Sequence, residues 1–479
     1  MSTREAERPA PARLVVESPD RYTEIFVIDT SFDRRAAGVG RLEAEIPPGL
    51  YKIKYKLGRS SEEAFVRLNP GETRRLEAPR FRFSSPAPLE DTRTTQERHM
   101  YPAVGLADQI QMDLGGGALL FVFTRWMGPG GSTPTEQPAA TGIVLVGPSG
   151  ETVADLGRVG EHEPADGWSA FGLRAPAGDY RLRYAVPEGP ALEQALILQD
   201  GWQLQIFLPL EPDPGGPRVR GSEATVYMRR DPAFEPGDEG VRLTEMARTA
   251  LLCGRQVIGP TEMHDMLWAK EDNPILGLLG ALLLTLHPEP DLPLLREVIG
   301  NLGPALGATH PDVLALQAWL ALRDAEYPVP DLPVIHPPMA RRSWDLAVEA
   351  ALAFPHEIPP GSMAEAVADR VMGGGVWLTW QAVEKAPAPP GLDLETTLPT
   401  LATALAVGTE GEGFQKEMAE APVVQQALMA ALPPDLTSGG PVDTGRIQTR
   451  LARQLGVPPS TVVRAAGELA ERLRKLRDR

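Results

Sequence analysis

The side chains that could do chemistry are few and scattered along the chain. None of the seven histidines lies in a His-Glu-x-x-His arrangement, the spacing with which a helix presents a catalytic zinc site. They are His99, His162, His264, His287, His310, His336 and His356. His264 and Asp265 lie near Glu262 on an expected helix, and we interpret these three as an exposed polar face. The sequence therefore predicts no metal site, no cofactor and no catalytic residue.

Three further patterns come close to reactive motifs without completing them. Cys253 follows two leucines at an apolar helix end and lacks the Gln-Ala-Cys-x-Gly surroundings of a caspase nucleophile, so we expect it to be buried. Ser169 is one residue away from the Gly-x-Ser-x-Gly spacing of a nucleophile elbow and lies on an expected strand. The glycines at 373–375 lack the Lys and the Ser or Thr of a phosphate-binding loop. We predict that the chain is not an enzyme.

The end of the chain has the residue types that contact nucleic acids. Residues 446–479 contain nine Lys or Arg and three Asp or Glu, within a protein of net charge -17. Leu451 and Leu455 have the spacing of a packed helix, and Gly456 allows a left-handed turn after it. Residues 449–465 resemble the helix-turn-helix of bacterial regulators. The resemblance implies that a second helix enters the major groove, and the residues expected to contact DNA or a partner are Arg450, Arg453, Ser460, Thr461 and Arg464.

A second interpretation of this segment stays open. Residues 456–462 would form the turn of a plain helical hairpin, and the arginines would form a solvated or protein-binding face. Two observations favour this interpretation. The helix that follows is expected to continue to Arg477, which is long for a recognition helix, and the acidic remainder of the protein would repel DNA. Protein docking or a structural role is therefore the first expectation, and DNA binding is the alternative.

The composition limits the class of protein. The 479 residues suffice for about three domains. The pI near 5.0 argues against a surface that follows nucleic acid or anionic lipid along its whole length. The N-terminus has charges of both signs and no apolar core, unlike a signal peptide. The longest apolar run, 275–286, is about half of what a membrane span needs. We expect a bacterial-type cytoplasmic protein with no membrane contact.

The elements that would position these side chains fall into two halves. The first half contains short strands at roughly ten-residue spacing, which is typical of a β-sandwich. One stretch occurs twice, because 46–55 and 175–184 share Pro-x-Gly-x-Tyr followed by basic, aliphatic, basic and Tyr. In the first copy Tyr51, Ile53 and Tyr55 would face a core, and the alternating lysines would face water. We predict a flexible tail at 1–12, sandwich modules at 13–84 and 100–210, a polar linker at 84–100 and a further linker at 211–240 that contains one strand at 224–228.

The repeated Pro-x-Gly-x-Tyr strand resembles that of PEGA-type, transthyretin-like and carboxypeptidase-regulatory-like β-sandwich modules. The resemblance covers the ten residues of each copy, 46–55 and 175–184. It implies a fold, two sandwich modules joined in one chain. It also implies a role as a spacer or a binding platform rather than as a catalyst.

From residue 241 the hydrophobic period changes from two to about 3.6. Helices are expected at 243–251, 261–270, 275–286, 294–302 and 313–323, and then at 343–353, 362–371, 376–384, 396–406 and 422–432. In the third helix Gly277, Gly280 and Ala281 are small enough to let a neighbouring helix approach closely. We divide this half into a helical domain at 241–326, a second helical subdomain at 340–435 and the basic segment at 441–479. The predicted fold class is an all-β N-terminal half followed by an all-α C-terminal half.

One stretch of the helical half carries a second resemblance. Residues 273–316 contain the elements NPILGLLGALLL, LLREVIGNLGPALG and HPDVLAL. They resemble a helical region of uncharacterised bacterial proteins that accompany caspase-like proteases. The resemblance implies a protein partner, such a protease in a bacterial antiviral defence or stress system, with this chain as adaptor, inhibitor or substrate. The leading hypothesis is a non-enzymatic interaction protein, and the alternative is a transcription regulator that binds DNA through the C-terminal segment.

Overall fold

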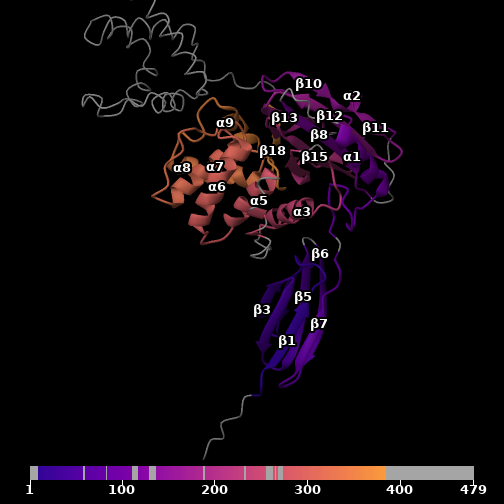
Figure 1. Cartoon of the computed structure of the whole chain (residues 1–479), viewed down its shortest axis with the longest axis vertical. Helices are drawn as coiled ribbons and strands as arrows, with labels where there is room; N and C mark the ends of the chain where they lie inside the picture. Colours follow the sequence, from indigo (N-terminus) through magenta and orange to yellow (C-terminus); the bar gives the residue numbers. More distant parts are fainter. Residues whose placement is uncertain are drawn as a thin grey trace, which may run out of the picture.

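The computed structural model describes residues 9–383, apart from short gaps at 58–59, 82, 110–116, 129–135, 187–188, 231–232, 255–262, 265 and 268–272. Over this range strands dominate up to Arg229 and helices dominate from Glu239 onwards, as Figure 1 shows. A β-rich N-terminal half followed by a helical half is therefore confirmed. The expected helices at 396–406 and 422–432 and the basic segment at 441–479 lie outside the described residues. In the described chain, none of the helices combines the length and the apolar character that crossing a bilayer requires.

The first seven strands form a module that projects from the rest of the molecule (Figure 1). They are β1 (Ala12–Glu17), β2 (Glu24–Ile28), β3 (Arg34–Val39), β4 (Arg41–Ile46), β5 (Gly49–Leu57), β6 (Ser60–Leu68) and β7 (Thr73–Glu77). Their order in the sheet is β6-β5-β2-β3-β4-β1-β7. β3 and β4 are joined by one residue pair, Val39 with Arg41, so the sheet folds into two sandwich-like layers at this point. The core between the layers contains the fully buried Leu14, Ile25 and Ile53.

The repeated strand has the same local structure in both copies. In β5 the two tyrosines and the isoleucine are buried, which confirms the predicted core side, and the lysines between them are half-buried. The Tyr51 hydroxyl donates a hydrogen bond to the Pro47 carbonyl at 2.7 Å. In the second copy the Tyr180 hydroxyl donates to the Pro176 carbonyl at 3.1 Å. In both copies the tyrosine therefore stabilises the turn before it. Its ring packs in the core, and its hydroxyl donates to the carbonyl of the proline four residues earlier.

Residues from Ala118 onwards build two further sheets. One has the order β11-β12-β8-β15-β16, with β17 beside β15, and the other has the order β10-β9-β13-β14-β18. The strands are β8 (Ala118–Trp126), β9 (Ile143–Val146), β10 (Thr152–Asp155), β11 (Glu161–Glu163), β12 (Trp168–Ala175), β13 (Gly178–Tyr184), β14 (Leu192–Leu198), β15 (Gln203–Glu211), β16 (Arg218–Val219), β17 (Thr225–Arg229) and β18 (Thr379–Gln381). Every residue of β8 and of β14 is buried, so these strands are covered on both faces. Helices α1 (Glu97–Gln109) and α2 (Leu156–Val159) pack against β12.

Both segments that were expected to be linkers are packed into this β region. Within 84–100, Ser85, Ala87 and His99 are fully buried, and the last residues begin α1. Within 211–240, β17 pairs antiparallel with β15 along its whole length, so the strand expected at 224–228 is confirmed with a shift of its ends. The prolines and glycines of these segments form tight turns between packed elements. Composition alone does not distinguish such turns from a free linker.

Five of the expected helices are confirmed, and α5 lies at their centre. They are α3 (Glu239–Leu252), α5 (Pro274–Leu284), α6 (Leu292–Leu306), α7 (Pro311–Arg323) and α8 (Arg341–Ala353). Every residue of α5 is buried, and the helix packs against α3, α6, α7 and β17. A Cβ atom at Gly280 would lie 3.0 Å from Leu267 Cδ2, so a small residue is needed there, as the sequence predicted. The helix expected at 362–371 is shorter, because α9 (Met363–Val367) gives way to the 3-10 turn η3 (Ala368–Arg370).

The helix expected at 376–384 is wrong. The segment is extended, and β18 pairs antiparallel with β14. Trp377 Nε1 donates to the Ala224 carbonyl at 2.7 Å, and Trp380 Nε1 donates to the Glu193 carboxylate at 3.1 Å. Both indoles are fully buried, so tertiary partners determine the backbone here and override the helical spacing. The chain therefore returns from the helices to complete a sheet of the second β region.

Candidate functional site

The residues expected to contact DNA or a partner lie outside the described residues. They are Arg450, Arg453, Ser460, Thr461 and Arg464. The structure places none of them, so their role stays a prediction. The described residues contain four other kinds of candidate: a Ser–His pair, two hollows, buried charged groups and exposed apolar side chains.

Ser169 and His162 face each other across the β11–β12 ladder, an arrangement that the sequence analysis missed. Ser169 Oγ lies 2.9 Å from His162 Nδ1, which is the distance of a nucleophile and its base. Ser169 is fully buried, however, and its Oγ also accepts a hydrogen bond from the Ala140 backbone N–H at 3.1 Å. Burial lowers the pKa of His162, so the neutral ring shares this hydrogen bond with the serine hydroxyl. A buried hydroxyl with both partners in place favours a structural cross-link between β11, β12 and the segment before β9.

A cavity of 280 Å³ lies close to this pair, between α1, β8 and β12. Neither Ser169 nor His162 lines it. Its lining residues are Leu106, Gln109, Phe121, Val159, Gly160, Glu161, Ala170, Phe171 and Gly172. Glu161 is the one titratable side chain among them, and a lone carboxylate without a base, a nucleophile or a positive partner defines no reaction.

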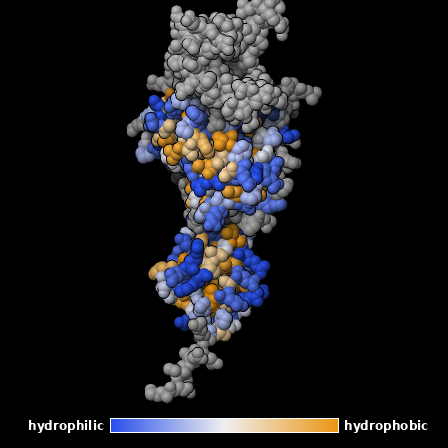
Figure 2. All heavy atoms as spheres, turned by 90° about the vertical axis from the view of Figure 1, so that its left-hand side faces the viewer, coloured by the Kyte–Doolittle hydropathy of each residue, from blue (hydrophilic) through white to orange (hydrophobic). Residues whose placement is uncertain are grey.

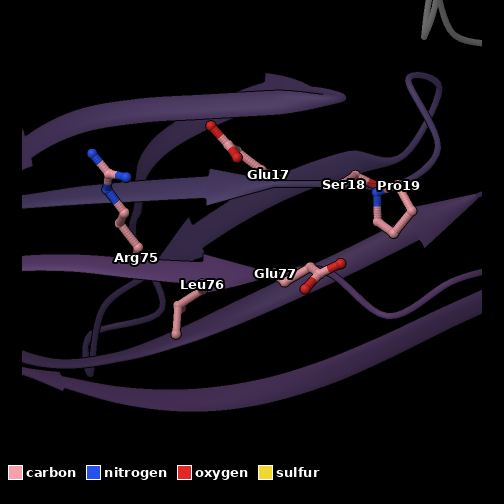
Figure 3. A pocket seen from close by; sticks show the side chains of 6 residues that line it. All are labelled: Glu17, Ser18, Pro19, Arg75, Leu76 and Glu77. Atoms are coloured by element: carbon pink, nitrogen blue, oxygen red, sulfur yellow. The ribbon is translucent and has the colours of Figure 1, made fainter.

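A larger hollow of 410 Å³ lies at the β1–β7 edge of the first module. Figure 3 shows its side chains, which come from Glu17, Ser18, Pro19, Arg75, Leu76 and Glu77. Glu17 and Glu77 are neighbours in the parallel ladder, and the Arg41 guanidinium lies 3.7 Å from Glu17. The charged groups spread along the strands instead of converging on one point (Figure 3). This geometry suits a shallow charged surface rather than a catalytic centre.

Arg125 is a fully buried cation at the end of β8. Its guanidinium donates to the backbone carbonyls of Pro86 at 2.7 Å, Thr94 at 2.9 Å and Ser85 at 2.6 Å. Burial lowers the pKa of Arg125 to about 9, and the Glu245 carboxylate opposes this change. The side chain thus ties the segment 84–95 to the second β region, which explains why that segment is not a free linker.

Two buried carboxylates connect neighbouring elements, Glu193 between strands and Glu245 between α3 and β17. The fully buried Glu193 accepts two hydrogen bonds from Arg183, at 2.9 and 2.6 Å, in addition to the one from Trp380. The fully buried Glu245 on α3 accepts from both ends of the Arg248 guanidinium at 3.0 Å and from the Thr225 hydroxyl at 2.7 Å. Each carboxylate has a cation and at least one further donor, so its charge is compensated inside the protein.

His310 is a further buried titratable group. Its side chain is fully buried at the start of α7, and neither ring nitrogen has a hydrogen-bond partner among the described residues. Nδ1 lies 3.6 Å from an Asp312 carboxylate oxygen. That carboxylate already accepts from the backbone N–H groups of Met339 at 2.8 Å and Ala340 at 2.9 Å. Burial lowers the pKa of His310, so the ring is neutral near pH 7.

Large apolar side chains are exposed at several positions on regular elements and tight turns. The most exposed are Leu352 at 84%, Phe32 at 82% and Phe65 at 71%. Phe32 has φ of 65°, a left-handed conformation that bulky residues rarely adopt, in a turn organised by Asp29. Figure 2 views the molecule from the side of α6 and α8 and shows hydrophobic atoms gathered over the helical part. Contiguous exposed apolar patches are typical of protein-binding surfaces, whereas single exposed apolar side chains are common on any protein surface.

The comparisons with known proteins are weak. The Bacillus anthracis TIE protein is 11% identical with a TM-score of 0.15, over 37% of this chain and 29% of that protein's length. A candidate cell adhesion protein from Bacteroides eggerthii is 9% identical with a TM-score of 0.13, over 46% of this chain and 95% of that one. No protein-family model matches the chain, and no curated protein matches it. Likeness at these TM-scores carries no argument about function.

Proposed function

We propose that this chain is a non-enzymatic interaction protein of a bacterial antiviral defence or stress system. Two β-sandwich modules similar to PEGA-type modules would form its platform, and the helical part would dock a protein partner in the cytoplasm. The partner class is a caspase-like protease, with this chain as its adaptor, inhibitor or substrate. The partner class rests on the sequence resemblance of residues 273–316, and the docking surface rests on α8.

The observation that carries the docking surface is a pair of exposed aliphatic side chains on α8. Leu352 is 84% exposed, and Val348, one turn earlier on the same face, is 40% exposed. The opposite face of α8 packs into the core through the buried Leu346 and Ala350. A rigid helix that presents aliphatic groups to solvent suits an apolar pocket of a partner, because binding removes these groups from water at little entropic cost.

Polar side chains around the pair are held by ion pairs within the protein. Glu349 accepts from the Arg323 guanidinium at 2.6 Å and from Trp319 Nε1 at 3.0 Å. Asp345 pairs with Arg341 at 3.1 Å. These pairs leave the aliphatic centre bordered by charged groups with defined positions, which is the arrangement of an interface with an apolar centre and a polar rim.

The test is direct binding of the full chain to a purified caspase-like protease encoded beside it. Leu352→Asp should weaken binding at least tenfold, because a carboxylate would be buried in the apolar contact. The matched control is Phe32→Asp, which replaces an equally exposed side chain in the first module and should leave affinity unchanged. If Leu352→Asp binds the protease as tightly as the unchanged chain, the docking surface does not include α8. If the unchanged chain neither binds the protease nor is cleaved by it, the partner class is rejected.

The alternative is a transcription regulator that uses its C-terminal segment. The sequence observation in its favour is the excess of nine Lys or Arg over three Asp or Glu in 446–479. Retention of the full chain on DNA should then fall steeply with salt and should weaken on Arg464→Ala. Failure to bind DNA at low salt would reject this function without affecting the protein-docking proposal.

A further inference from the structure

One edge of the first module is open to pairing with another strand. β6 (Ser60–Leu68) is the terminal strand of its sheet and pairs with β5 over all nine residues, from Gly49 with Leu68 to Leu57 with Ser60. Within the residues that the structure describes, no strand lies on its other side. An edge of this length presents unpaired backbone N–H and C=O groups that can add a further strand.

The side chains of β6 divide between two faces. Ala64, Val66 and Leu68 face the core side, since the β5 register sets Val66 opposite the buried Tyr51. Glu63, Phe65 and Arg67 alternate with them and lie on the outer face. Phe65 is 71% exposed at the middle of this face, although it lies on a regular strand.

The two charged residues beside Phe65 have opposite signs and equal spacing from it. The Glu63 side chain is 42% exposed and lies 3.2 Å from Lys52 Nζ, so it can accept a second cation from outside the module. Arg67 is exposed and has no ion pair among the described residues. The outer face of β6 therefore carries an acidic, an aromatic and a basic side chain at alternate positions, Glu63, Phe65 and Arg67.

We propose that β6 pairs antiparallel with β6 of a second copy of this chain, about a twofold axis at Phe65. In this register residue i lies opposite residue 130 minus i, so Phe65 meets Phe65 of the second copy. Glu63 then lies opposite Arg67 of the second copy, and the symmetry repeats the pair on the other side of the axis. Aromatic pairs and opposite charges directly across two strands both stabilise antiparallel pairing. The interface closes after two copies, because each copy uses its single β6 edge.

The pairing of Glu63 with Arg67 of the second copy specifies the register of the two β6 strands. This complementarity favours a second copy of the chain as the partner over an unrelated strand. If one strand slides by two residues in either direction, Phe65 faces Glu63 or Arg67 and both cross-strand ion pairs are lost. Only the register centred on Phe65 satisfies all three outer-face residues at once. Because the outer face of β6 is complementary to itself, the strand that pairs best with it is β6 of a second copy.

The first experiment measures the association of the full chain by sedimentation velocity. We expect a dimer for the unchanged chain, and at least a tenfold higher dissociation constant for Glu63→Arg and for Arg67→Glu, since each creates like charges across the axis. The double variant Glu63→Arg with Arg67→Glu should restore the dimer, because it exchanges the signs without losing complementarity. Glu77→Arg on the opposite edge strand is the matched control and should not change association.

A second experiment tests the axis itself. In a Cys253→Ser background, Phe65→Cys should form a disulfide between two copies, because only residue 65 lies opposite itself. Glu63→Cys should not, since its counterpart would lie roughly 13 Å away along the strands. A monomeric chain at about 100 µM, a dimer that survives both single charge reversals, or cross-linking through residue 63 in place of 65 would each overturn the proposal.

Discussion

The first module and the second β region contain the same repeated strand but differ in where the strands at their sheet edges come from in the sequence. In the first module β6 and β7 are terminal strands of a single folded sheet. In the second region the edge of β14 is covered by β18, which comes from residues after the helices, and the edge of β15 is shared by β16 and β17. The same local motif therefore occurs in a module that projects from the molecule and in a region to which a distant part of the chain adds an edge strand.

The second region relies on compensated charges such as Arg125 and Glu193, whose partners are backbone carbonyls and side chains from several elements. The first module meets the helical half through polar contacts, because Arg242 on α3 lies 3.1 Å from Asp20 of the first module and Arg21 lies 3.1 Å from Glu239 of α3. An exposed edge can bind a partner at little cost to the module's own core, whereas a completed edge contributes to stability.

The largest effect is expected where the edge is completed by β18. Trp380→Ala should lower the free energy of unfolding of the second region by about 3–5 kcal/mol, because it empties a fully buried indole site and removes the hydrogen bond to Glu193. Guanidinium chloride unfolding followed by the fluorescence of the remaining tryptophans measures this change. All of these tryptophans lie between residues 126 and 377, so the signal excludes the first module.

The matched substitution on the open edge is Phe65→Ala. In dilute solution it should change the stability of the first module by no more than about 0.5 kcal/mol, because the ring is mostly exposed. Hydrogen exchange of the β5 amides reports on this module separately. Similar losses for Phe65→Ala and Trp380→Ala would mean that the two edges do not differ in the way described.

An effect smaller than that of Trp380→Ala is expected from acid, and only outside the first module. Burial lowers the pKa of His99 from 6.5 to about 4, and the ring donates from Nε2 to the Asp166 carbonyl at 2.7 Å. Below pH 6.5 the unfolded chain therefore binds a proton that the folded chain does not. Stability is complete above pH 6.5 and falls as the pH approaches 4, by about 3 kcal/mol in total. The first module contains no histidine and lacks this source of acid sensitivity.

The measurement is the free energy of unfolding of the second region at intervals between pH 7 and pH 4.5. His99→Asn should flatten the dependence, and the exposed His356→Asn should leave it as it is. Burial of His310 acts in the same direction, so part of the slope should remain in the first variant. An unchanged slope after His99→Asn would remove this residue as the cause.

The sequence predicts those elements whose pattern is local. The alternation around Tyr51 and the apolar run that became α5 both carry their structure in neighbouring residues. β18 was predicted as a helix because its determinants are remote: the partner of Trp377 is 153 residues away and that of Trp380 is 187 residues away. No periodicity within the segment contains this information.

The candidate site follows the same rule. His162 and Ser169 are brought together by the register of a short hairpin, and the sequence analysis considered Ser169 without its cross-strand neighbour. The turn residues between them, which include Pro164 and Gly167, were a usable signal for that hairpin. The exposed face of β6 could be derived from alternation alone, whereas its position at an edge required the strand order.

The last prediction tests what the two copies of the repeat share. Tyr51→Phe and Tyr180→Phe each remove one hydroxyl that donates to the carbonyl of the proline four residues earlier, and each leaves the ring in place. Each should cost about 0.5–1.5 kcal/mol in its own part of the molecule, because the carbonyl loses a partner near the surface. Hydrogen exchange of β5 and of β13 measures the two costs separately. A cost confined to one copy would show that the motif is structural there and only a sequence coincidence in the other, even though both hydrogen bonds form.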